Sequence, residues 1–165
     1  MKHWVLAALL AAIIGQASAQ DMKIRDVFKQ MPDSLMPYLS ANNRLDFIDF
    51  MDSGMKAEVT NLTGGKSVMT ALTDDSLSIR MNEALRVDMI LMSLDQPVDS
   101  IRQVVVFNET FLTDTIYGET LCKIYSVEWQ PVTGDLPFND VQKKRLEGLY
   151  LQNILKWSED KLNNR

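Results

Sequence analysis

The spacing of apolar residues along the chain changes near Gly54. Before this glycine, apolar residues recur every three or four positions, which is the period of an amphipathic helix. After it, apolar and polar residues alternate in short runs, which is the period of a strand. Short polar connections separate these runs. The pattern therefore predicts N-terminal helices followed by an antiparallel meander of about five or six strands.

Helical spacing is clearest over residues 40–53, and Gly54 supplies a natural stop. A shorter helix is expected from Asp21 up to Pro32. The apolar side of 40–53 is formed by Leu45, Phe47, Ile48, Phe50 and Met51. The other side carries Asp46, Asp49 and Asp52. We interpret these aspartates as a solvated acidic stripe, because acids on one helix cannot enclose a cation without facing oxygen ligands.

Alternating positions predict the strands, and Gly64-Gly65 predicts a hairpin turn between 57–62 and 66–73. Cys122 alternates with Ile124 and is expected to be a buried small hydrophobe. The large aromatic Trp129 is expected in the core rather than stacked on a sugar. The predicted strand positions are Val68, Thr70 and Leu72; Leu77, Ile79 and Met81; Leu85, Val87, Met89 and Leu91; Val104 to Phe107; and Leu121, Tyr125, Val127 and Trp129.

A helix is expected at the C-terminal end, after a linker that contains Pro131, Gly134 and Pro137. Asn139 and Gln142 have the spacing of a capping box. The helical face is marked by Leu146, Leu149, Tyr150, Ile154, Trp157 and Leu162. Gly148 leaves open whether the helix is continuous. We expect the helix to pack on the sheet, which gives a single globular α+β domain over 20–165.

Residues 1–19 have the features of a cleaved signal peptide. Lys2 is followed by an apolar run over 4–14, and Ala17-Ser18-Ala19 fits the cleavage pattern. No cysteine follows the cleavage point to carry a lipid anchor, and no later segment reaches the roughly 20 apolar residues of a membrane span. The sequence therefore predicts a soluble exported protein, periplasmic or secreted, that is not a lipoprotein and has no integral membrane span.

The composition excludes several chemistries. The only histidine, His3, lies in the expected leader, so the mature chain has no histidine for a catalytic triad or a metal site. A single cysteine forms neither an intramolecular disulfide nor a thiolate zinc cluster. Acidic residues outnumber basic ones by 22 to 17, which argues against nucleic acid as a partner. We expect no metal and no cofactor.

Two short motifs resemble catalytic ones without their remaining parts. Ser53 and Lys56 match the Ser-x-x-Lys of penicillin-recognising enzymes, but the second serine motif and the Lys-Thr-Gly strand are missing. Residues 64–67 resemble the end of a phosphate loop, but Thr60 stands where the first glycine belongs. We interpret the first motif as a chance match and the second as a hairpin turn.

Carboxylates are the remaining acid and base groups. Glu109, Asp114, Glu119 and Glu128 lie on or near the predicted strands, and a facing pair would suit hydrolysis. Charged residues on the open face of a sheet are the simpler interpretation. We therefore favour a non-enzymatic binding or interaction module. The alternative is a carboxylate-dependent hydrolase that acts on glycan or peptide.

Several stretches resemble a Bacteroidales-restricted family of exported proteins carried as a domain of unknown function. The similarity is strongest from Pro32 to Ser67 and includes 33–35, 42–46, 50–53 and 55–61, with Tyr125 and Trp129 later in the chain. The resemblance implies an envelope protein of that bacterial group and brings no catalytic residues. We expect the partner to be an unknown envelope protein or a glycan.

Within the stretch of strongest similarity, the candidate interaction surface is polar. It consists of Arg44, Asp46, Lys56 and Glu58.

The same resemblance gives a second meaning to four Asp-Ser/Thr-aliphatic tripeptides. They are similar to the O-glycosylation sequon that these bacteria use on exported proteins. Turn chemistry explains the same residues, because Asp and Ser bond to their own backbone in turns. Our hypothesis is that at least one site is modified, and the candidate acceptors are Ser34, Ser76, Ser100 and Thr115.

Overall fold

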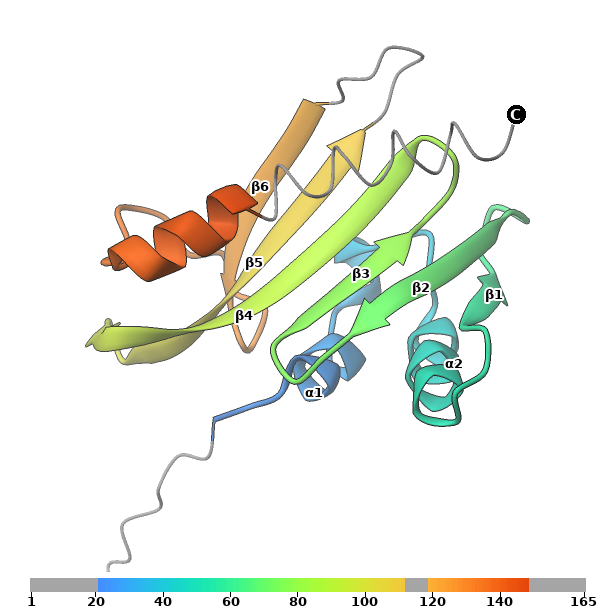
Figure 1. The fold of residues 1–165 in the computed structure, drawn as a ribbon, viewed down its shortest axis with the longest axis horizontal. Helices are drawn as coiled ribbons and strands as arrows, with labels where there is room; N and C mark the ends of the chain where they lie inside the picture. Colours follow the sequence, from blue (N-terminus) through green and yellow to red (C-terminus); the bar gives the residue numbers. More distant parts are fainter. Residues whose placement is uncertain (1–20, 112–118, 149–165) are drawn as a thin grey trace, which may run out of the picture.

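The computed structural model describes residues 21–111 and 119–148 (Figure 1). The N-terminal helices are α1 (Ile24–Lys29), the 3-10 helix η1 (Asp33–Leu35) and α2 (Ala41–Asp52). The strands are β1 (Glu58–Thr60), β2 (Lys66–Leu72), β3 (Ser76–Arg80), β4 (Leu85–Val98), β5 (Ile101–Phe111) and β6 (Glu119–Ser126). A further helix covers 140–148. This architecture confirms the predicted α+β class.

The six strands form one antiparallel sheet in sequence order, which confirms the predicted meander. The hairpin turn at Gly64-Gly65 is also confirmed, since Gly64 has a φ of +84° and the Asn61 amide donates to the Gly65 carbonyl at 2.8 Å. The turn between β4 and β5 consists of Asp99 and Ser100, both at positive φ. Such a turn matches the twist of the strands that it joins.

Helix α2 matches the segment predicted from 40–53. Ser40 accepts a hydrogen bond from the Asn43 amide at 3.2 Å, and Asn43 Oδ1 accepts from the Ser40 amide at 3.1 Å. This reciprocal pair is a capping box, which satisfies donors that the first helical turn leaves unpaired. Gly54, at a φ of +69°, follows the helix end.

Helices α1 and α2 cover one face of the sheet, over β1 to β4 (Figure 1). Their apolar side chains meet alternate positions of the strands, because successive strand residues point to opposite faces. Trp129 is buried in the same cluster, as expected. The principal buried residues are Ile24, Val27, Phe28, Phe47 and Ile48 from the helices, and Leu77, Ile79, Val87, Met89, Val105 and Phe107 from the strands.

The opposite face carries a smaller apolar cluster of Ile90, Met92, Leu94, Val104 and Val106. Leu136, Phe138 and Leu146 pack on it, so the helix at 140–148 lies on the sheet as predicted. The capping box is confirmed, because the Gln142 amide donates to Asn139 Oδ1 and the Asn139 amide donates to Gln142 Oε1, both at 2.9 Å. The predicted positions 149–162 lie outside the described residues.

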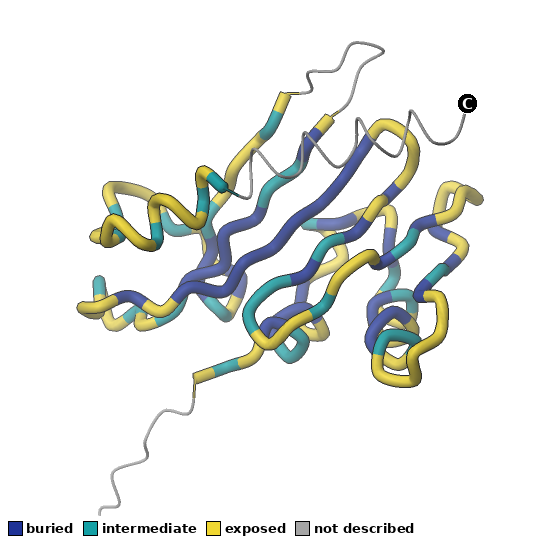
Figure 2. Tube along the Cα trace, in the orientation of Figure 1, coloured by how far each residue is buried: buried dark blue, intermediate teal, exposed yellow. Residues whose placement is uncertain are grey.

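Burial differs from the prediction at four strand positions, two on β2 and two on β6 (Figure 2). On β2 the buried side chains are Ser67 and Met69 rather than those of Val68 and Thr70, and the register shifts between Met69 and Ala71. Cys122 is exposed because it lies on the edge strand β6, outside the apolar cluster of its face. Leu121 on the same strand is 42% exposed. On β6, the position of the strand at the edge of the sheet decides which side chains are exposed, and the alternation of apolar and polar residues does not.

Leu45, expected on the apolar side of α2, is 43% exposed, while Phe47 and Ile48 are buried. The helix turns a narrower apolar stripe toward the sheet than its composition indicates. None of the described helices has the length and hydrophobicity to cross a membrane.

Candidate functional site

Arg44 does not belong to an exposed polar surface, and this part of the prediction is wrong. Its side chain is 3% exposed and lies between α1 and α2. Its Nη2 donates to the Met31 carbonyl at 2.7 Å and its Nη1 donates to the Leu39 carbonyl at 3.1 Å. A guanidinium is buried here because it satisfies carbonyls that the chain leaves free between the two helices.

The other three residues of the predicted surface are accessible to different degrees. Asp46 and Lys56 are exposed, and Glu58 is partly exposed at the start of β1. Lys56 Nζ lies 2.5 Å from Glu58 Oε2, and this lysine lowers the pKa of the Glu58 carboxyl. An exposed pair of this kind is worth little to stability.

Ser53 caps the C-terminal end of helix α2. Its Oγ donates to the Asp49 carbonyl at 2.7 Å and lies 3.1 Å from the Phe50 carbonyl. The hydroxyl proton is therefore engaged with the last turn of α2. Lys56, the other residue of the Ser-x-x-Lys match, is paired with Glu58.

The carboxylates considered for hydrolysis lie on and after β5 and β6. Glu109 Oε2 accepts from Lys123 Nζ at 2.9 Å across the two strands, and this contact raises the pKa of Lys123. Glu119 and Glu128 are exposed. Asp114 lies outside the described residues.

Three of the candidate glycosylation acceptors are described, and each lies in a turn or at a strand start. Ser34 is exposed in η1, and Ser100 is exposed in the turn between β4 and β5. Ser76 begins β3, and its Oγ lies 2.8 Å from Thr73 Oγ1. Thr115 lies outside the described residues.

A groove of about 480 Å³ lies where five segments of the chain meet, and we call it the Asp75 groove. It combines apolar side chains with charged and amide groups. The groove is lined by Asp21, Met22, Lys23, Asp74, Asp75, Leu91, Met92, Ser93, Gln103, Val141, Gln142 and Arg145.

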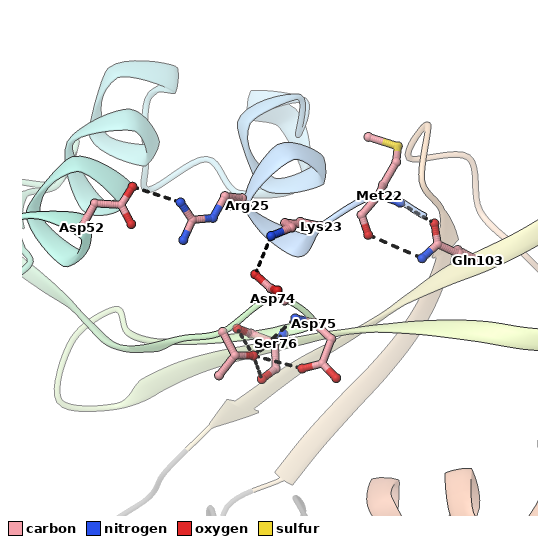
Figure 3. Close-up of polar contacts among 9 residues, drawn as sticks. Met22, Lys23, Arg25, Asp52, Asp74, Asp75, Ser76 and Gln103 are labelled. Carbon is pink, nitrogen blue, oxygen red and sulfur yellow. Dashed lines mark hydrogen bonds and ion pairs between the residues drawn. The ribbon is translucent and has the colours of Figure 1, made fainter. Parts of the chain in front are cut away.

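One wall of the Asp75 groove is the segment before α1 (Figure 3). The Met22 amide donates to Gln103 Oε1 at 2.9 Å, and Lys23 Nζ lies 3.1 Å from Asp74 Oδ1. The Ile24 amide donates to the Asp74 carbonyl at 2.9 Å. The segment is thus held to β5 and to the turn before β3 by both backbone and side-chain contacts.

The other wall is the helix at 140–148. Arg145 Nη2 donates to Asp75 Oδ2 at 2.7 Å, and Gln142 Nε2 donates to the Ser93 carbonyl at 2.7 Å. Burial acts to raise the pKa of the Asp75 carboxyl, but hydrogen bonds from Arg145 and Thr73 outweigh it and the pKa lies below its ordinary value. Val141 stands on this wall with 77% of its surface exposed.

A second groove of about 550 Å³ borders the same N-terminal segment. Asp21, Met22 and Gln103 line both grooves, so one wall serves two surfaces. The second groove also includes Ser100 and Glu128.

The chemistry of the Asp75 groove suits recognition of a polar ligand. The side-chain amides of the groove can donate and accept hydrogen bonds, and its carboxylates can accept them. Met22 and Val141 offer apolar contact. Over 21–111 and 119–148, no cluster of three or more His, Cys, Asp or Glu side chains is arranged to hold a metal ion. This site could not be predicted from the sequence, because its residues come from separated segments and form no local motif.

A buried polar cluster on β3 and β4 was not predicted from the sequence. On β4, Arg86 Nε donates to Asp88 Oδ2 at 3.0 Å, and Arg86 Nη2 donates to Ser78 Oγ on β3 at 3.2 Å. Arg86 and Asp88 are both buried. Their i, i+2 spacing in a strand was the available signal, because it places both side chains on one face.

Comparison with known proteins bears on fold and family. A domain of an uncharacterized protein from Porphyromonas gingivalis W83 has a similar structure, with a TM-score of 0.55 and 20% sequence identity. The match covers 79% of this chain and 69% of that chain. At this identity the likeness concerns the fold alone. None of the curated proteins matches the sequence significantly.

The family model described as "Protein of unknown function (DUF3256)" matches residues 15–155, which is most of the chain. The chain therefore belongs to the DUF3256 family.

Proposed function

We propose that this protein is an exported envelope protein of Bacteroidales that acts as a non-enzymatic binding module. In this proposal the Asp75 groove holds a segment of a polar ligand, either a glycan or a peptide of an envelope partner. The signal-like residues 1–19 support the exported location. The organism of the structurally similar domain, Porphyromonas gingivalis, is consistent with the bacterial group.

The observation that carries the proposal is the mixed lining of the Asp75 groove. Its hydrogen-bonding groups come from separate segments that are fixed to one another, so they are oriented before a ligand arrives. Preorganised groups of this kind reduce the entropy that binding costs. The exposed Val141 and the partly buried Met22 add apolar surface beside them, as in most small-ligand sites.

Binding is favoured over hydrolysis by the state of the acids. A general acid at neutral pH needs a raised pKa, whereas the pKa of Asp75 is lowered. Asp74 and Glu109 are each paired with a lysine. Groups held in this way serve as hydrogen-bond acceptors for a ligand, which is what a binding site requires.

The test of this proposal is a binding measurement with a blocked groove. Val141→Trp adds bulk at an exposed position, so folding is expected to be retained. Oligosaccharides and peptides released from the native envelope are passed over the immobilised wild-type protein and the variant. We expect retained material on the wild type and at least a tenfold loss on Val141→Trp, since a bulky ring at the rim forfeits several ligand contacts.

Met55→Trp is the matched control, because Met55 is 55% exposed and lies outside the Asp75 groove. It should bind as the wild type does. Equal retention by Val141→Trp and the wild type would exclude the groove as the binding site.

We further propose that the protein is O-glycosylated, with Ser100 and Ser34 as the favoured acceptors among the described candidates. Both are exposed, as a transferase requires. Ser76 is the weaker candidate because its hydroxyl is engaged with Thr73. Mass spectrometry of protein from the native host tests this proposal and export together. Cleavage after Ala19 should leave Gln20 as the first residue, and a mass equal to that of the bare 20–165 chain would exclude modification.

A further inference from the structure

Strand β6 is an open edge of the sheet. It pairs with β5 on one side. On the other side Tyr125, near the end of the strand, forms an isolated antiparallel bridge with Pro131, and within the described residues no strand pairs with the earlier part of β6 (Figure 1). Four of its first five residues, Glu119, Leu121, Cys122 and Lys123, are exposed (Figure 2). An open edge presents unpaired backbone groups that a further strand can join.

The backbone groups available at this edge are those of Thr120 and Cys122. The Ile124 carbonyl accepts from the Val132 amide, and the Ser126 amide donates to the Gln130 carbonyl, so even-numbered residues direct their groups away from β5. Because the strand has a period of two, Thr120 and Cys122 do the same. No backbone partner for either group on that side is found over 21–111 and 119–148.

The side chains along this edge are complementary to themselves. Glu119, Leu121 and Lys123 lie on one face of β6, and Phe111 lies across from Glu119 on β5. Leu121 is 42% exposed and Phe111 is 39% exposed. Glu119 forms no ion pair with another described residue. An antiparallel copy of the same strand, centred on Leu121, places each Glu119 opposite a Lys123.

We propose that a second copy of this chain docks on β6, and that the two β6 strands pair antiparallel about a twofold axis at Leu121. In this register Leu121 faces its own equivalent, and Thr120 exchanges backbone hydrogen bonds with Cys122 of the second copy. The pairing supplies about four backbone hydrogen bonds. It joins two sheets into one continuous sheet across a self-complementary interface.

The charged side chains favour the register centred on Leu121 over the register centred on Cys122. Centring the pair on Cys122 would place Lys123 opposite Leu121 and Glu119 opposite Tyr125, and neither pair is complementary. It would also extend the pairing to Ile124, whose carbonyl is already bonded to Val132. In the Leu121 register, Lys123 lies between Glu109 of its own chain and Glu119 of the second copy, so both carboxylates share its charge.

Cysteine crosslinking tests the register. The variant Leu121→Cys/Cys122→Ser carries its thiol at the twofold axis, at a non-hydrogen-bonded pair. The Cα atoms of such a pair are about 4.5 Å apart, which is within the range that a disulfide spans. Oxidation with copper phenanthroline should convert this variant to a covalent dimer. The wild type, with its thiol one residue away at Cys122, should crosslink far less.

The control variant is Leu45→Cys/Cys122→Ser, because Leu45 on α2 is as exposed as Leu121. It should remain uncrosslinked under the same oxidation. Crosslinking of all three proteins to the same extent would show random collision and overturn the proposal. Preferential crosslinking through Cys122 would overturn the register.

Charge reversal tests the interface without a crosslink. Glu119→Lys places two lysines opposite each other twice in the dimer, and should weaken dimerisation by about tenfold in sedimentation velocity experiments. Asp46→Lys makes the same change of net charge on α2 and should leave the dimer as it is. A wild-type protein that stays monomeric at every concentration, or a dimer that Glu119→Lys does not weaken, would overturn the proposal.

Discussion

Arg44 and Asp33 form an ion pair whose two ends lie in different surroundings. The Nη2 and Oδ1 atoms are 2.8 Å apart, yet the Arg44 side chain is 3% exposed and that of Asp33 is 66% exposed. The arginine also bonds to two backbone carbonyls, those of Met31 and Leu39. Its role is therefore to satisfy the buried backbone between α1 and α2, and the aspartate contributes from the solvent side.

Unequal costs are expected when the two partners are replaced. Arg44→Met leaves both carbonyls without their donor and should lower the free energy of unfolding by about 2 to 4 kcal/mol. Asp33→Asn removes a largely solvated charge and should cost about 1 kcal/mol or less. Urea denaturation of both variants measures the difference. Equal losses would mean that the ion pair, and not the carbonyl contacts, dominates the role of Arg44.

Asn61 fixes the first hairpin from a buried position. Its Nδ2 donates to Ser67 Oγ at 3.0 Å, and its Oδ1 accepts from the amides of Thr63 and Gly65. Asn61→Ala should lower the free energy of unfolding by about 2 to 3 kcal/mol, because it removes these bonds inside the protein. Asn82→Ala, at an exposed turn position, is the matched control and should cost under about 1 kcal/mol. Similar decreases in the free energy of unfolding for the two variants would show that the burial of Asn61 does not strengthen the contribution of its hydrogen bonds to stability.

Arg145 sets the acidity of Asp75 in the Asp75 groove. Replacing it with glutamine removes the charged donor, while the burial that raises the pKa of Asp75 remains. We expect the pKa of the Asp75 carboxyl to rise in Arg145→Gln. A carbon-detected NMR titration of the aspartates measures this shift, and an unchanged pKa would place the cause elsewhere.

The same pair predicts a pH dependence of stability. Folding lowers the pKa of the Asp75 carboxyl from its ordinary value of 3.8. The Arg145–Asp75 pair therefore stabilises the folded state at pH values above 3.8, and this stabilisation is lost as the pH falls through the lowered pKa. Arg145→Gln should therefore be less stable than the wild type near pH 6, by about 1 kcal/mol or less, since the pair is half exposed. The difference should vanish toward about pH 2. Thermal unfolding across this range provides the test.

Trp129 is buried with its backbone in the left-handed region, at a φ of +63°. Its ring packs beside Tyr125, and its Nε1 donates to the Val27 carbonyl at 2.9 Å. Trp129→Ala should lower the free energy of unfolding by about 3 to 5 kcal/mol. Trp129→Gly should be more stable than Trp129→Ala by about 1 kcal/mol, because glycine adopts positive φ without strain. The reverse order in calorimetry would exclude backbone strain at this position.

The fold could be predicted well because its signals are local. The period of α2, the capping residues Ser40 and Asn139, and the turn at Gly64-Gly65 each depend on a few neighbouring residues. Sequential strand pairing then follows from short connections.

The wrong predictions of burial have a different cause. They concern residues whose exposure depends on where their helix or strand lies in the folded protein. Arg44 looked like a surface residue by type, and only the packing of α1 against α2 buries it. Cys122 and Leu121 looked like core residues by alternation, and only their place on an edge strand exposes them. The Asp75 groove draws on segments as far apart as Met22 and Arg145, so no window of sequence contains it.

The order of the sheet has a consequence for how the chain folds. Every strand pairs with its neighbour in sequence, so each pairing closes only a short loop. The bond from Trp129 to Val27, by contrast, joins residues 102 positions apart. Since closing a long loop costs more entropy than closing a short one, hairpins are expected to form first and the N-terminal helices to dock late. Tryptophan fluorescence would then report the final docking step, and backbone circular dichroism the earlier formation of the sheet.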